Sequence, residues 1–116
     1  MRADDNTRLN LMLNRLQACF AASRVLYTRH ARNEMRLEEF GPIYEQEVFE
    51  AVQSGKVIED YPDDEPYPSV LVYGRTTTGR AIHVVCAYAN EDDLAIVITV
   101  YEPDPARWLD FERRRP

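Results

Sequence analysis

The chain has 116 residues, of which 45% are hydrophobic and 29% are charged, and its formal net charge is −6. This length and composition predict a single globular domain, 1–116, with one modest core. No run of about 18 apolar residues is present, so we expect no membrane-spanning helix, and the polar start of the chain is unlike a secretory signal. The net negative charge argues against strong non-specific binding to nucleic acid.

The charge is unevenly distributed along the chain. Residues 1–37 carry seven arginines and three acidic residues, a balance of +4, whereas residues 38–116 have a balance of −10. A basic patch that attracts phosphate or an acidic partner is therefore predicted beside an acidic remainder. Cys19 and Cys86 have neither metal-ligand nor redox spacing, so we expect two buried, unpaired thiols and a cytoplasmic location.

The first half of the chain has the periodicity of helices. Apolar residues recur every three or four positions over 7–21, which predicts an amphipathic helix. The stretch VLYT favours an extended segment, and Thr28 is a good N-cap for a second helix over 29–37. A third helix is predicted from about residue 44 to Gly55, where glycine suits a helix end.

The second half has the pattern of strands. β-branched and aromatic residues concentrate in KVIEDY, SVLVYG, RAIHVVCAYA and DLAIVITVY, which predict four strands, the last three joined by short turns. Asp104 and Pro105 resemble a helix start, so we expect a short C-terminal helix with Trp108 as a core anchor. The predicted fold class is α+β, with N-terminal helices packed on one face of a four-stranded, mostly antiparallel sheet.

The expected turns, Thr76–Gly79 and Asn90–Asp93, set the register of the last three strands. They place His83 on the helix-facing side of the sheet, and Arg75, Arg80 and Tyr101 on the other side. The predicted cross-strand pairs are Val72–His83, Tyr73–Ile82, His83–Val100, Ile82–Tyr101, Val84–Thr99 and Cys86–Val97.

The two histidines, His30 and His83, are the first candidates for chemistry. His83 is either a core histidine bonded to a carbonyl or another side chain, or a reactive group. His30 lies on the second helix, between an outward face of Arg29, Arg32 and Arg36 and a core face of Ala31 and Met35. Glu34 follows four residues later and can orient the imidazole.

Cleavage of RNA by its own 2′-hydroxyl fits these residue types, because it needs only a base, an acid and positive charge for the phosphorane. In this hypothesis His30 and His83 are the acid/base groups and Tyr101 is an auxiliary hydroxyl. Neither a metal nor a cofactor is predicted. The expected phosphate contacts are Arg32, Arg36, Arg75 and Arg80.

Four stretches together resemble a known bacterial family, the domain of unknown function numbered 4258: TRHARNEMR, VIEDYPDD, LVYGRTTTGRAIHVV and IVITVYEPDPARW. The similarity covers about residues 25–110, which leaves 1–24 as an N-terminal helical extension. It implies that His30 and His83, the positions that mark the family, are important. The family is more remotely similar to the RelE and BrnT toxins of toxin–antitoxin pairs, which are small α+β ribonucleases.

That remote similarity implies a RelE/BrnT-like fold, an mRNA interferase-like activity, and RNA and an antitoxin as partners. The alternative is a non-catalytic module of the same fold that binds a protein or a small ligand. In that alternative the histidines are structural, and the arginines of the second helix bind an acidic partner.

Overall fold

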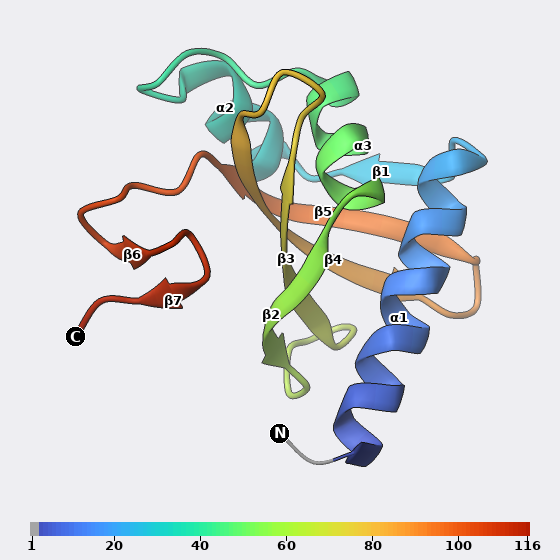
Figure 1. The fold of residues 1–116 in the computed structure, drawn as a ribbon. Helices are drawn as coiled ribbons and strands as arrows, with labels where there is room; N and C mark the ends of the chain where they lie inside the picture. Colours follow the sequence, from blue (N-terminus) through green and yellow to red (C-terminus); the bar gives the residue numbers. More distant parts are fainter. Residues whose placement is uncertain (1–2) are drawn as a thin grey trace.

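The structure is a computed structural model that describes residues 3–116, with side chains from residue 5 onward. Residues 1–2 of the expected N-terminal extension therefore lie outside the described part. The elements, in chain order, are α1 (Ala3–Ala21), β1 (Val25–Tyr27), α2 (Arg29–Leu37), α3 (Glu45–Gln53), β2 (Lys56–Tyr61), β3 (Ser69–Arg75), β4 (Ala81–Ala89), β5 (Leu94–Tyr101), β6 (Trp108–Leu109) and β7 (Arg113–Arg114). The α+β class and the three N-terminal helices are confirmed (Figure 1). No helix in residues 3–116 is long and apolar enough to cross a membrane.

The main sheet has five strands in the order β1-β5-β4-β3-β2, so the predicted count of four is wrong by one. β2 to β5 form an antiparallel meander, and the extra strand, β1, pairs in parallel with β5, with Val25 opposite Ala95. A three-residue strand that pairs with a partner seventy residues later leaves little local signal, so only its extended conformation was predictable.

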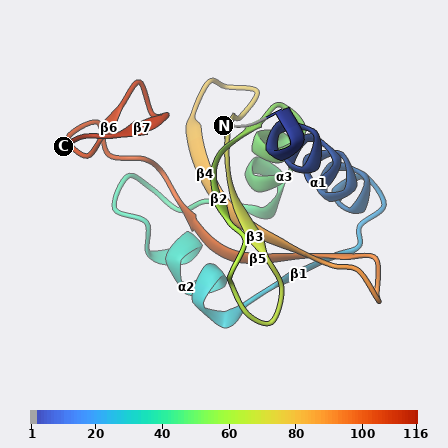
Figure 2. The ribbon, with the colours of Figure 1, turned by 90° about the horizontal axis from the view of Figure 1, so that it is seen from below.

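The core lies between one face of this sheet and the helices α1 and α3, which run side by side (Figures 1 and 2). Burial of each large apolar side chain contributes about 1.5–3 kcal/mol. The helix α3 approaches the sheet closely at Gly74 of β3, where a Cβ atom would lie 1.7 Å from the carbonyl oxygen of Ala51. The fully buried members of this core include Leu16, Cys19, Val48, Ala51, Val52, Val70, Val72, Ile82, Val84, Cys86, Val97 and Val100.

The second helix, α2, lies along an edge of the sheet. β1 ends at Tyr27, and from Thr28 onward the neighbouring edge of β5 is completed by side chains. The Val100 amide donates to Glu34 Oε1 (3.1 Å), and the Glu102 amide donates to Glu38 Oε2 (3.4 Å). The helix α2 thus covers an open strand edge, and its buried residues Ala31 and Met35 join the core that α1 and α3 form with the sheet.

The register differs by one residue from the prediction at the turn between β3 and β4. Tyr73 is opposite His83, and Arg75 is opposite Ala81, because the turn includes Arg80. Between β4 and β5 the predicted Cys86–Val97 pair is confirmed, but a bulge follows and places His83 opposite Tyr101. Val84 is correspondingly opposite Val100, and the predicted pairs Val84–Thr99 and His83–Val100 are wrong.

This shift changes the face on which His83 lies. A slip of one residue exchanges the two faces of a strand. Val72, Val84 and Val100 belong to the helix-facing core, whereas His83 joins Tyr73 and Tyr101 on the opposite face. The predicted separation of His83 from Tyr101 is therefore wrong.

Residues 104–116, which we call the strap, form a turn and the two-stranded sheet β6–β7, and the predicted C-terminal helix is wrong. Asp104 does cap a turn, because its Oδ1 accepts from the Ala106 amide (2.9 Å). The chain then reverses, so that Trp108 and Arg114 are paired neighbours. Contacts of the strap with the sheet outweigh the weak helix propensity of this segment. In both ribbon views the strap lies away from α1 (Figures 1 and 2).

Candidate functional site

A groove of about 780 Å³ separates α2 from the strap. Two of the three predicted catalytic residues, His30 and Tyr101, line it, and the third, His83, lies beneath Tyr101. The full lining is His30, Asn33, Glu34, Leu37, Glu38, Glu39, Phe40, Tyr101, Glu102, Asp104, Arg107, Trp108 and Arg114.

His30 is the exposed member of the site, because 67% of its side chain is accessible. Thr28 caps α2 through its side chain, which accepts from the Ala31 amide (3.1 Å), and the imidazole stands on the first turn of this helix. Its Nε2 lies 3.3 Å from Glu34 Oε1, the oxygen that also accepts from Val100. Burial raises the pKa of Glu34. A carboxylate fixed to a strand edge thus orients a solvent-facing imidazole.

His83 is completely buried, and both of its ring nitrogens are engaged. Nε2 lies 2.6 Å from the Phe111 carbonyl, and Nδ1 lies 3.1 Å from the Tyr101 hydroxyl. Burial lowers the pKa of His83 to about 4, so the ring is neutral at pH 7. A carbonyl only accepts, so Nε2 carries the proton and donates it to Phe111, and Tyr101 donates to Nδ1.

This assignment limits what His83 can do. The Tyr101 proton is directed at His83, and burial raises the pKa of Tyr101 to about 12. No nitrogen of His83 faces the groove, so any effect of His83 on a ligand there passes through Tyr101. The observed bonds are those of the structural alternative, in which a core histidine binds a carbonyl and another side chain.

Arg114 lines the groove and is held by Glu59, and none of Arg114, Glu59 and Tyr61 was among the predicted site residues. Arg114 donates Nε to Glu59 Oε2 (2.8 Å) and Nη2 to Oε1 (3.1 Å), and its guanidinium stacks on Trp108 at 4.7 Å. The Tyr61 hydroxyl donates to Glu59 as well. Burial alone would raise the pKa of Glu59, but the hydrogen bonds from Arg114 and Tyr61 lower it. Arg114 and Glu59 are 55 residues apart in the sequence, so no local pattern predicts that they pair. The run of arginines at 113–115 was the only sequence feature that pointed to this site.

The four arginines predicted to contact phosphate do not line this groove. Arg32 and Arg36 line a separate hollow of about 400 Å³ with Tyr44, and Arg32 pairs with Glu45. Arg75 donates to the Gly79 carbonyl (2.8 Å) and stacks near Tyr73 and Phe111.

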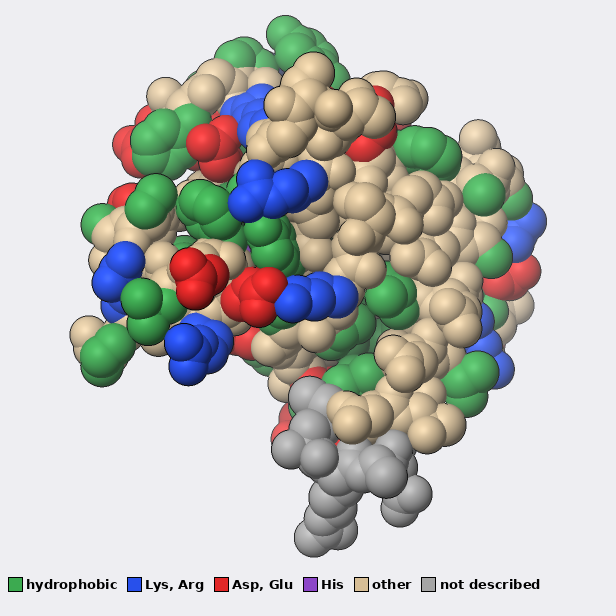
Figure 3. Space-filling model, in the orientation of Figure 1, with side chains coloured by type: hydrophobic (Ala, Val, Ile, Leu, Met, Phe, Trp, Pro, Cys, Tyr) green, Lys and Arg blue, Asp and Glu red, His purple; other side chains and the backbone are tan. Residues whose placement is uncertain are grey.

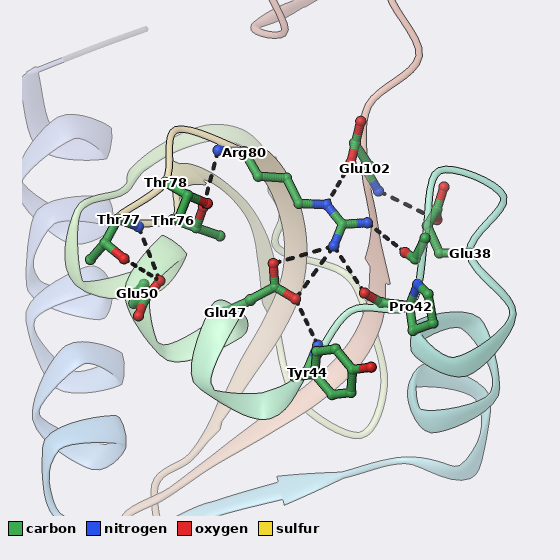
Figure 4. A network of polar contacts seen from close by, with 11 residues as sticks. Glu38, Pro42, Tyr44, Glu47, Glu50, Thr76, Thr77, Thr78, Arg80 and Glu102 are labelled. Atoms are coloured by element: carbon green, nitrogen blue, oxygen red, sulfur yellow. Dashed lines mark hydrogen bonds and ion pairs between the residues drawn. The ribbon is translucent and has the colours of Figure 1, made fainter.

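Arg80 is engaged inside the protein (Figure 4). Its Nε donates to Glu102 (2.5 Å), Nη1 donates to Glu47 and to the Pro42 carbonyl, and Nη2 donates to the Gly41 carbonyl. This guanidinium therefore joins the turn between β3 and β4 to α3, to the loop before α3 and to the residue after β5, and it has little donor capacity left for a ligand.

The groove itself is mainly acidic. Five carboxylates line it, Glu34, Glu38, Glu39, Glu102 and Asp104, against the guanidinium groups of Arg107 and Arg114. In Figure 3, side chains of both charges gather over the strap side of the molecule. In the described part of the chain, no three His, Cys, Asp or Glu side chains are grouped as metal ligands.

Two apolar side chains border the same groove. Leu37 is 68% exposed and Phe40 is 48% exposed. Exposed apolar groups beside carboxylates suit a ligand that combines cationic and apolar groups.

Comparison with known proteins gives a family but no activity. Neither a search of curated proteins nor a search of solved structures found a match. The family model described as domain of unknown function (DUF4258) matches residues 27–102, which include α2, α3, the four-stranded meander from β2 to β5, and both histidines. The match covers well over half of the chain, and the chain belongs to this family.

Proposed function

We propose that the chain is a binding module that takes a basic, partly apolar segment of a partner protein in the groove between α2 and the strap. The observation that carries this proposal is the coincidence of five carboxylates with the exposed side chains of Leu37 and Phe40. Lysine and arginine suit such a surface, because their aliphatic stems cover apolar groups while their charges reach carboxylates.

The carboxylates differ in how free they are to bind. Glu102 is paired with Arg80, Glu34 accepts from the Val100 amide of β5, and Glu38 accepts from the Glu102 amide just after β5. Glu39 has no hydrogen bond or ion pair among residues 5–116, so its charge is available to a ligand. Glu39 and Leu37 are therefore the residues on which binding should depend most and folding least.

The test uses a fluorescent synthetic peptide of alternating lysine and leucine and a matched peptide of glutamate and leucine. We expect the cationic peptide alone to bind, and Leu37→Ser and Glu39→Lys each to weaken it about tenfold. Leu11→Ser and Asp63→Lys are the matched controls, because both residues are exposed and lie outside the groove. Equal affinity for the two peptides, or insensitivity to both groove variants, would reject the proposal.

The second candidate function is metal-independent cleavage of RNA, as in a toxin of the RelE/BrnT type. The corrected register favours it, because His30 and Tyr101 line one groove together with Arg107 and Arg114. His30 would take the proton of the attacking 2′-hydroxyl, and the leaving 5′-oxygen would take a proton from water. Tyr101 would assist as a hydroxyl positioned by His83, and the two arginines would contact phosphate. In this reading the basic segment bound in the groove belongs to an antitoxin. It ranks second because the five carboxylates repel phosphate.

The assay for cleavage incubates the protein with free and with ribosome-bound RNA in the presence of EDTA. This candidate predicts a cyclic phosphate product from the wild type and its loss in His30→Ala and in Tyr101→Phe, with circular dichroism showing that both variants are folded. Intact RNA with both substrates, or activity that survives both substitutions, would remove this candidate and leave the binding module.

A further inference from the structure

The strap covers a sheet face that is polar and titratable. Tyr73, His83 and Tyr101 form one row across β3, β4 and β5, and Glu59 lies on β2. Buried faces are usually apolar, because each buried polar group needs a partner. No buried side-chain polar atom in the described residues lacks a hydrogen bond, so these partners are present.

The strap supplies the decisive partners. The Phe111 carbonyl accepts from His83, and Arg114 makes a two-pronged pair with Glu59. The Phe111 ring lies 6.3 Å from the ring of Tyr73, with the Arg75 guanidinium 5.5 Å from its centre. The family match ends at residue 102, so this cover lies outside the region that the family model describes.

The strap is also strained where it touches His83. The turn from Leu109 to Glu112, closed by a hydrogen bond of 2.9 Å, has two central residues with positive φ. These are Asp110 (53°) and Phe111 (63°), and a bulky residue in the left-handed region is unfavourable. Backbone strain of this kind persists only where surrounding contacts hold it, and it often marks a functional contact.

We infer that the face of β2 to β5 beneath the strap is a peptide-binding site that the strap occupies within the same chain. Its ligand is a segment of a partner protein that carries an aromatic residue and, three residues later, an arginine. The aromatic residue would occupy the place of Phe111 and offer its carbonyl to His83, and the arginine would pair with Glu59. This site is distinct from the groove of the proposed function, although the strap forms one wall of that groove.

Because the strap is joined to the sheet by the chain itself, an external segment must bind tightly to displace it. A segment joined by a short linker acts at an effective concentration in the millimolar range, so the strap excludes weak competitors. The strained turn weakens the binding of the strap to the sheet. A partner segment with asparagine or glycine at the turn position of Asp110 avoids part of that strain.

The test weakens the strap in the full chain and supplies its contacts from outside. The probe is a fluorescent peptide with the sequence of residues 104–116, and the strap-weakened chain carries Phe111→Ala and Arg114→Gln. We expect this chain to bind the peptide at least tenfold more tightly than the wild type does. Adding Glu59→Gln to the weakened chain, or using a peptide with glutamine in the place of Arg114, should abolish the gain.

The matched control is Arg113→Gln, which changes the neighbouring exposed arginine of β7 and should leave binding as in the wild type. If the weakened chain is unstable, hydrogen exchange of the wild type is measured instead, and excess peptide should accelerate exchange in residues 108–114. A folded weakened chain that binds no better, or a peptide that binds equally without its arginine, would overturn the inference. A concentration-dependent complex between the weakened chain and the wild-type chain, whose strap is intact, would show a second copy as occupant and overturn the choice of a different partner.

Discussion

The buried contacts of His83 stabilise its imidazole ring in the neutral form. Its proton on Nε2 and its acceptor at Nδ1 are both required by the two groups that face it, Phe111 and Tyr101. Protonation would place a second proton on Nδ1, so the Tyr101 hydroxyl would have to turn and accept where it now donates. Because both ring nitrogens are occupied, His83 cannot act directly on a ligand in the groove. The same contacts make the stability of the fold depend on pH in the acid range.

The first prediction concerns this pH dependence. The pKa of His83 falls from 6.5 to about 4 on folding, so the unfolded chain binds more protons between these two values. The free energy of unfolding should therefore fall as the pH drops from about 6.5 to about 4, by about 3 kcal/mol in total from this residue, and change no further below that. Urea unfolding at several pH values checks the slope.

The control for this prediction is His83→Gln, in which the contribution of this ring is absent. Other groups, such as Glu34, also titrate in acid, so the comparison uses the difference between the two proteins. Parallel pH profiles for wild type and His83→Gln would contradict the depressed pKa, and so would a His83 resonance that titrates near 6.5.

At the scale of elements, the packing of α3 on β3 depends on one missing side chain. The backbone of Ala51 lies directly over Gly74, with three of its atoms within 3 Å of the position that a Cβ would occupy. Gly79, by contrast, has no atom within 4 Å of the position that a Cβ would occupy, but its φ is +90°, so its substitution is costly only through backbone strain.

The second prediction compares these two glycines. Gly74→Ala must push α3 away from the sheet, so we expect a loss of about 3 kcal/mol or more in the free energy of unfolding. Gly79→Ala should cost about 1–2 kcal/mol, the usual penalty of the left-handed region. Thermal or urea unfolding measures both, and a Gly74→Ala protein as stable as Gly79→Ala would contradict the close packing of α3.

The covered edge of β5 leads to the third prediction. Glu34→Ala removes the acceptor of the Val100 amide, and a partly buried donor left unpaired costs about 1–3 kcal/mol. Amide exchange at Val100 should accelerate more than at Val84, which lies in the centre of the sheet. Glu39→Ala is the control, and a slow Val100 amide in Glu34→Ala would contradict the role of Glu34 at this edge.

Much of the local structure was predictable from the sequence. The cap at Thr28 and the burial of Ala31 and Met35 on α2 followed from helical periodicity and are confirmed. The register was not predictable, because a turn that takes in Arg80 and a bulge after Val85 each shift the pairing by one residue. Such irregularities depend on tertiary contacts, here the many bonds of Arg80, that no local pattern contains.

The candidate site was predictable only in part for the same reason. Composition and spacing singled out His30, His83 and Tyr101, which the structure brings into one neighbourhood. The arginines near them in sequence lie elsewhere, whereas Arg114 and Glu59 meet across 55 residues. A linear pattern reveals which side chains can do chemistry, but the partner of each is decided by the fold.

On the scale of the whole molecule, ion pairs connect part of the basic first third of the chain to the acidic remainder. Arg8 pairs with Asp60, Arg24 with Asp93 and Arg32 with Glu45, so the basic first third of the chain lies against acidic residues of the remainder.

These pairs are exposed and should each contribute little. Arg80 differs, because only 18% of its side chain is accessible and it holds two carboxylates, Glu47 and Glu102, together with two loop carbonyls.

The fourth prediction follows from this contrast. Arg80→Gln leaves two partly buried carboxylates without their cation and should lower the free energy of unfolding by about 2–4 kcal/mol. Arg8→Gln should change it by less than about 1 kcal/mol, and high salt should mask even that difference. Equal effects of the two substitutions in urea unfolding would show that the Arg80 network does not tie the molecule together.

The pairing of β1 with β5 also affects the order in which parts of the fold form during synthesis. Val25 meets Ala95, so the strand that leads into α2 has no partner until about seventy further residues have been made. Contacts of such long separation form late, because the intervening chain must first be ordered. On the ribosome, we therefore expect α1 and α3 to gather on the growing meander first, and the His30 side of the groove to assemble last, after β5 has left the exit tunnel.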